Sequence, residues 1–134
     1  MQSYSKTDAR VADDETVSLI SADKVEGTSV YNHADEKIGT IQDVMINKRS
    51  GFVAYAVMSF GGFLGIGEKY HPLPWQVLKY DTSVDGYRVN LDKETLQGAP
   101  SYDRAGLEDL DWNDTAWNRQ VHEYYKLPPT GLGL

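Results

Sequence analysis

Short apolar runs separated by turn residues fill the chain from Val17 to about Leu91. This spacing is typical of a small antiparallel sheet or barrel. The runs at 29–31 and 38–47, joined by a polar loop at 32–37, predict a first hairpin. The second run also fits helical spacing, but its glycine, its β-branched residues and the flanking turns favour a strand.

A second hairpin is predicted where the polar residues 48–51 lead into the apolar run Phe52–Phe60. Gly51 can adopt positive φ, as a tight turn requires. The residues on both faces of this strand are apolar, whereas a strand with one face in solvent would alternate apolar and polar residues. One face must therefore fill an interior, and a loop, a helix or another subunit must cover the other.

The next elements are shorter. The run 69–75 predicts an edge strand that ends in a turn, because Pro72 and Pro74 cannot donate to a ladder. Further strands are expected at 76–81 and 86–91. Asp92 is predicted to be the N-cap of a helical turn that ends at Gly98.

The pattern changes after Pro100. Residues 101–113 are rich in acidic side chains and predict an exposed connector. Asp114 then caps an expected amphipathic helix that runs to Lys126 and is stopped by two prolines. Trp117, Val121 and Tyr124 form its apolar stripe. So short a helix is marginal alone, so the stripe must dock on its own barrel or on a neighbouring subunit.

Together these elements predict an all-β fold. We expect a six-stranded antiparallel β-barrel at 17–100, preceded by a flexible tail at 1–16. The acidic connector at 101–113 and the C-terminal helix and tail at 114–134 follow it.

Composition and charge narrow the classes of function that this chain can have. The 134 residues carry 13 Lys and Arg against 20 Asp and Glu, a formal net charge of −7, which disfavours nucleic-acid binding. No run of about 18 apolar residues exists, so direct membrane insertion is not expected. The start of the chain has no secretory pattern, which favours a cytoplasmic location. The chain has no cysteine, which excludes disulfides and thiolate metal sites.

The glycine-rich run 61–67 has the glycine spacing of a phosphate-binding loop. Glu68 precedes the lysine, however, and two prolines forbid the helix that such a loop must open, so phosphate binding is disfavoured. The loop carries three apolar side chains, Phe63, Leu64 and Ile66. These side chains either fold onto the barrel or are offered to a partner.

Catalytic and metal-binding motifs are missing from the sequence. His33, His71 and His122 show no metal-ligand spacing, and His71 is the one expected to be buried. Asp43 lies in an apolar strand and is expected to bind turn amides or Lys48 or Arg49. We therefore predict no catalytic residue, no metal and no cofactor.

The segments Val30–Ile46 (VYNxxxEKIGxIxDVMI), Gly51–Phe60 and Gly61–Trp75 (GGFLGIGEKYHPLPW) resemble the PRC-barrel domain. That family includes the cytoplasmic part of the photosynthetic reaction centre H subunit and the C-terminal part of RimM. The resemblance covers about residues 17–100 and is strongest to stand-alone bacterial members. It implies a noncatalytic scaffold for protein contacts and brings no catalytic residues.

The resulting hypothesis is a protein-interaction module that forms homodimers. Its expected contact residues are Phe63, Leu64, Ile66, Trp117, Val121 and Tyr124. The alternative is a small-ligand carrier with a pocket near Tyr70, His71 and Trp75. An enzyme is the least favoured class, because no nucleophile, base and orienting group occur together.

Overall fold

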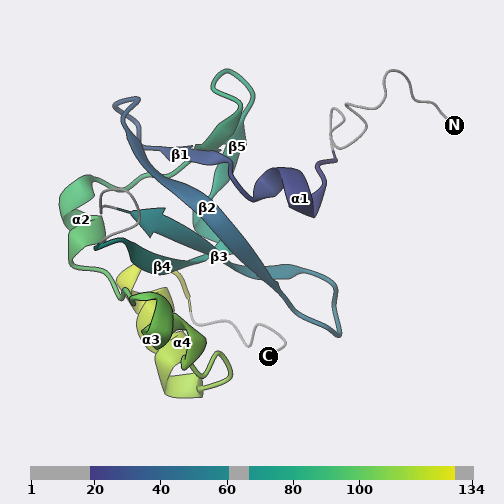
Figure 1. Cartoon of the computed structure of the whole chain (residues 1–134), viewed down its shortest axis with the longest axis vertical. Helices are drawn as coiled ribbons and strands as arrows, with labels where there is room; N and C mark the ends of the chain where they lie inside the picture. Colours follow the sequence, from purple (N-terminus) through teal and green to yellow (C-terminus); the bar gives the residue numbers. More distant parts are fainter. Residues whose placement is uncertain (1–18, 61–66, 129–134) are drawn as a thin grey trace, which may run out of the picture.

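A computed structural model describes residues 19–60 and 67–128 (Figure 1). Its strands form one six-stranded sheet in the order β4-β3-β2-β1-β6-β5. The strands are β1 (Ser29–Tyr31), β2 (Lys37–Ile46), β3 (Val53–Phe60), β4 (Lys69–Pro74), β5 (Lys79–Asp81) and β6 (Gly86–Arg88). The helices are α1 (Ala22–Val25), the 3₁₀ turn η1 (Trp75–Val77), α2 (Lys93–Gln97), α3 (Arg104–Glu108) and α4 (Thr115–Tyr124).

The two predicted hairpins are confirmed. β1 pairs antiparallel with β2, and β2 pairs antiparallel with β3. In the turn between β2 and β3, the side-chain oxygen of Asn47 accepts the N–H groups of Arg49 at 2.9 Å and Ser50 at 3.0 Å. Gly51 has φ of 80°, the conformation for which the turn selects glycine.

The expectation of an entirely antiparallel, closed barrel is wrong in two respects. β1 pairs parallel with β6, with Val30 opposite Tyr87, so the sheet is mixed. The two outer strands, β4 and β5, do not pair with each other within the described residues, and no closed ring of hydrogen bonds results. A parallel neighbour requires a long connection, here the chain from β2 to β5, which local patterns do not reveal.

β3 lies between β2 and β4 and is buried on both faces, as its sequence predicts. The register with β4 places Met58 opposite His71 on the inner face of the sheet, and the hydrophobic core includes side chains of both faces. Tyr55 lies opposite Pro74 on the outer face. α4 of the same chain covers this outer face, and its Val121 is fully buried.

The predicted helix caps are confirmed. The Asp92 carboxylate accepts the N–H of Thr95 at 2.7 Å at the start of α2. The Asp114 carboxylate accepts the N–H of Ala116 at 2.9 Å at the start of α4. Each carboxylate satisfies an amide that has no partner within its helix.

The acidic connector is more ordered than the sequence suggests, because it contains α3. Asp103 caps α3 through the N–H of Gly106 at 2.7 Å. Just before it, Tyr102 exchanges two backbone hydrogen bonds with Tyr70, at 2.8 and 3.0 Å. These bonds extend the edge of β4 and hold α3 and α4 beside the sheet (Figure 1).

Candidate functional site

An open cavity of about 630 Å³ lies between the end of the β2–β3 hairpin and the loop that precedes α4. We call it the hairpin groove. It is lined by Met45, Ile46, Asn47, Lys48, Arg49, Ala54, Tyr55, Trp112 and Asn113. The groove thus lies between the sheet and the C-terminal helices.

An aromatic cluster forms the inner side of the groove. The ring of Tyr55 lies 5.6 Å from that of Trp112 and 5.3 Å from that of Trp117. The Tyr55 hydroxyl donates to the side-chain oxygen of Asn118, whose amide donates to the Trp112 carbonyl at 3.0 Å. Burial raises the pKa of the Tyr55 hydroxyl, so it stays a neutral donor. These contacts make the groove a formed feature of the fold.

The hairpin end supplies what we call the basic wall, Lys48 and Arg49. Both residues are exposed, and neither side chain has an ion pair within residues 19–60 and 67–128. Two large apolar side chains are also exposed here, Ile46 at 52% and Phe52 at 76%. Apolar side chains beside free cations are features of a contact surface.

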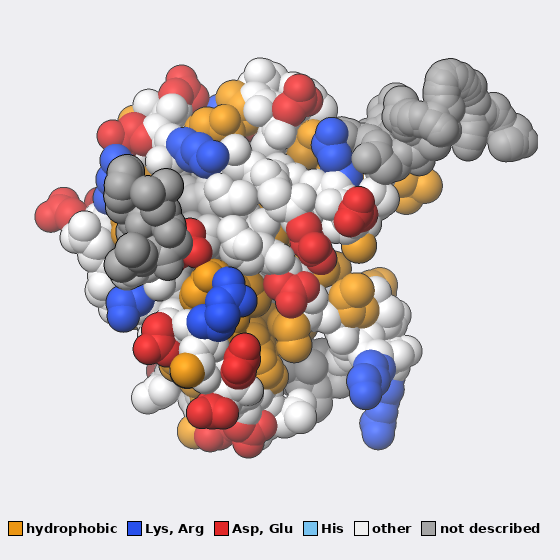
Figure 2. Space-filling model, viewed as in Figure 1, with side chains coloured by type: hydrophobic (Ala, Val, Ile, Leu, Met, Phe, Trp, Pro, Cys, Tyr) orange, Lys and Arg blue, Asp and Glu red, His pale blue; other side chains and the backbone are white. Residues whose placement is uncertain are grey.

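The end of α3 and the loop that follows it supply what we call the acidic wall, Glu108, Asp109 and Asp111. All three are exposed and lie within four positions of Trp112, which lines the groove together with Asn113. Figure 2 shows basic side chains at the hairpin end, acidic side chains over α3 and α4, and hydrophobic side chains between them. The charged residues that line the groove are therefore basic, and the acidic residues stand next in the chain to its Trp112 side.

The apolar stripe of the C-terminal helix docks in its own chain. Val121 is fully buried, and the Trp117 indole donates to the Tyr102 hydroxyl at 2.7 Å. The Tyr124 hydroxyl donates to the Thr95 carbonyl at 2.5 Å, which ties α4 to α2. The other predicted contact residues, Phe63, Leu64 and Ile66, lie outside the described residues.

The residues of the alternative ligand pocket are not brought together. Adjacent strand residues point to opposite faces, so Tyr70 and His71 diverge. The Tyr70 hydroxyl accepts from Arg104 at 2.6 Å and donates to Glu68 at 2.9 Å on the outer face. Trp75 packs edge-on against Tyr87, with ring centroids 5.5 Å apart.

His71 is buried, as predicted, at 2% exposure. Its ring meets that of Phe60 edge-on at 5.7 Å, and its Nδ1 has no hydrogen-bond partner within the described part of the chain. Burial lowers the pKa of this imidazole to about 4, so it is neutral at physiological pH. No group of three or more His, Asp or Glu side chains that could hold a metal ion occurs among residues 19–60 and 67–128.

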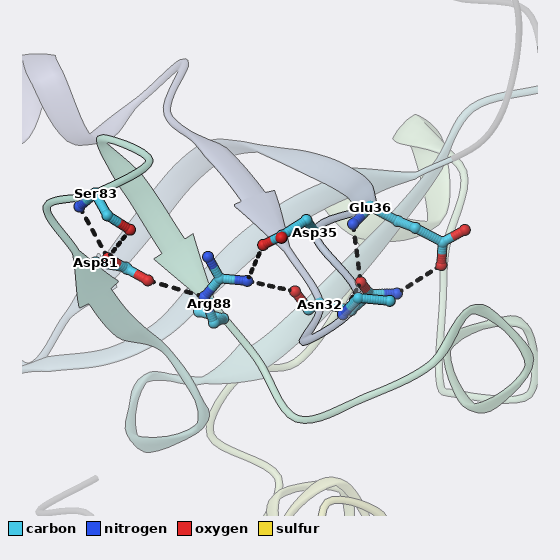
Figure 3. Close-up of polar contacts among 7 residues, drawn as sticks. Asn32, Asp35, Glu36, Asp81, Ser83 and Arg88 are labelled. Atoms are coloured by element: carbon cyan, nitrogen blue, oxygen red, sulfur yellow. Dashed lines mark hydrogen bonds and ion pairs between the residues drawn. The ribbon is translucent and has the colours of Figure 1, made fainter.

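Arg88 organises a polar network at the other end of the sheet (Figure 3). Its guanidinium contacts the carboxylates of Asp81 and Asp35, both at 2.9 Å, and donates to the Asn32 carbonyl at 2.7 Å. Hydrogen bonds from Ser83, together with Arg88, lower the pKa of Asp81 to about 2. The network joins the β5–β6 hairpin to the loop before β2, so its role is structural.

The remaining sequence candidates have structural roles. Asp43 lies at a β-bulge, and its carboxylate accepts the N–H of Val44 at 2.9 Å rather than binding turn amides. None of the described helices could cross a bilayer, since each is too short. The groove itself is not predicted by the sequence pattern. The signal available was the large apolar Phe52 directly after a basic turn.

Comparison with known proteins identifies the sheet. Residues 18–96 match the PRC-barrel domain. Among solved structures, a 16S ribosomal RNA processing protein, RimM, from Pseudomonas aeruginosa is 21% identical, with a TM-score of 0.36. That similarity covers 60% of this chain and 48% of RimM, so this chain spans about half the length of RimM. No curated protein matches the chain.

Proposed function

This chain belongs to the PRC-barrel domain family, and from that premise we propose that it is a noncatalytic protein-interaction module that self-associates. The observation that carries the proposal is the exposure of Ile46 and Phe52 beside an open groove. Burying such side chains against another protein is favourable, because it removes apolar surface from water.

The chemistry of the polar residues supports a noncatalytic role. Asp92, Asp103 and Asp114 are used as helix caps. Arg88 is used to join two loops through Asp35 and Asp81. Each of these groups satisfies a local partner, as a structural residue does.

Sedimentation velocity of the purified chain over a wide micromolar range tests the proposal. We expect the sedimentation coefficient to rise with concentration from that of a monomer to that of a dimer. A coefficient that stays at the monomer value throughout the range would contradict self-association.

A further inference from the structure

We infer that the hairpin groove is the self-association surface and that its occupant is the hairpin end of a second copy of this chain, related by a two-fold axis. This inference rests on the proposed self-association and specifies where it occurs. The residues that carry it are the basic wall, the acidic wall and the exposed Ile46 and Phe52.

Charge on the two walls makes the groove complementary to itself. Two copies that each carry −7 repel one another overall, so a contact between them needs a local attraction. A two-fold axis sets each basic wall against the acidic wall of the partner, and every contact then occurs twice. No described ion pair joins Lys48 or Arg49 to the acidic wall within one copy, so these charges are available.

Apolar contact would supply the rest of the interface. Ile46 and Phe52 leave more than half of their surface in solvent at the hairpin end. The aromatic side of the groove, Tyr55 and Trp112, is held in place by Asn118. The groove volume of about 630 Å³ is large enough for side chains of this size. A preorganised aromatic surface loses little freedom on binding.

A second copy fits this surface better than an acidic segment of another protein. An acidic partner would gain from Lys48 and Arg49 but would be repelled by Glu108, Asp109 and Asp111, which precede the groove residues Trp112 and Asn113 in the chain. A second copy carries both signs in the arrangement that the two walls require.

Charge exchange between the walls tests the inference on the full chain. One variant carries Lys48→Glu and Arg49→Glu, and the other carries Glu108→Lys and Asp109→Lys. All four side chains are exposed, so both variants should keep the fold, which circular dichroism checks. In each variant alone, like charges face each other at both contacts. In an equimolar mixture, opposite charges face each other at both contacts.

We expect each variant alone to sediment as a monomer and the mixture to form a one-to-one dimer. Controls with the same charge change lie elsewhere: Lys37→Glu with Lys126→Glu, and Glu26→Lys with Glu123→Lys, all at exposed positions. The controls should associate like the original chain. Added salt should weaken the wild-type dimer, because it screens exposed charges.

Three results would overturn the inference. If the original chain is a dimer and both wall variants associate as tightly as their controls, the groove is not the interface, although self-association stands. The same holds if only the change of Phe63, Leu64 and Ile66 to Ser dissociates the dimer. If both wall variants are monomers but their mixture stays monomeric, the two walls do not meet. A monomeric original chain would instead refute the proposed function itself.

Discussion

The two faces of β3 are both buried, but they are built differently. The inner face packs Met58 among apolar side chains of the sheet, with His71 as a polar group whose Nδ1 lacks a partner among the described residues. The outer face is aromatic, and Tyr55 at its centre is hydrogen-bonded to α4 through Asn118. Hydrophobic burial therefore defines the inner face, whereas hydrogen bonds position the helix that covers the outer face.

The largest effect on stability is expected when the pH is lowered, because the inner face buries His71. Between pH 6.5 and about 4 the unfolded chain protonates His71 and the folded chain does not, so stability falls as pH decreases through this window. With about 1.4 kcal/mol per pKa unit, the free energy of unfolding should drop by up to about 3 kcal/mol. Urea denaturation at several pH values measures this change.

His71→Gln should remove most of that dependence on pH. His33→Gln is the matched control, because His33 is exposed and should leave the dependence unchanged. An identical pH profile for the wild type and His71→Gln would show that His71 is not the group that titrates.

The outer face should be most sensitive at Asn118. Asn118→Ala removes the partners of the Tyr55 hydroxyl and the Trp112 carbonyl, and the free energy of unfolding should fall by about 2 kcal/mol. Urea denaturation at neutral pH measures the loss. Asn113→Ala is the control, because that side chain is exposed and should change stability by less than about 0.5 kcal/mol. Equal losses in both variants would contradict the role given to Asn118.

Tyr124 and Tyr125, at the C-terminal end of α4, allow a hydrogen-bonded hydroxyl and one without a partner in the described part of the chain to be compared directly. The Tyr124 hydroxyl donates to the Thr95 carbonyl, so Tyr124→Phe should cost about 1 kcal/mol. The buried Tyr125 hydroxyl has no partner among the described residues, so Tyr125→Phe should be neutral or stabilising. Thermal unfolding of the two variants compares them directly, and the opposite order would refute the hydrogen-bond assignment.

The smallest effect on stability is expected at Phe52, which directly precedes β3 and is exposed to solvent. Phe52 is 76% exposed, so Phe52→Ser should change the free energy of unfolding by less than about 0.5 kcal/mol. It should nevertheless weaken self-association about tenfold, if burial against a second copy contributes about 1.4 kcal/mol. Sedimentation velocity measures the association. Unchanged association would remove Phe52 from the interface.

Much of the local structure could be predicted from particular residues. Gly51 and the polar residues before it predicted the β2–β3 turn, and Asp92 and Asp114 predicted two helix starts that the structure confirms. The apolar pattern on both faces of β3 predicted that something must cover its second face. These features depend on neighbours in the chain, so the sequence pattern contains them.

The candidate site could not be predicted in the same way. Trp112 was expected in an exposed connector, and Lys48 and Arg49 were expected in a turn, as possible partners of Asp43. The groove exists because Tyr102 pairs with Tyr70 and Asn118 binds Tyr55, and these partners lie 32 and 63 positions apart in the chain. The apolar periodicity of a helix or strand reflects neighbours within a few residues, so it does not predict contacts at such separations.

The sequence by itself determined the two hairpins, the helix starts at Asp92 and Asp114, the need to cover both faces of β3, and the net negative charge. Only the tertiary structure decided that β1 runs parallel to β6 and that α4 covers its own sheet. Local preferences act over a few residues through backbone sterics and capping. The placement of whole elements depends on how they bury their apolar faces together, a property of the assembled chain.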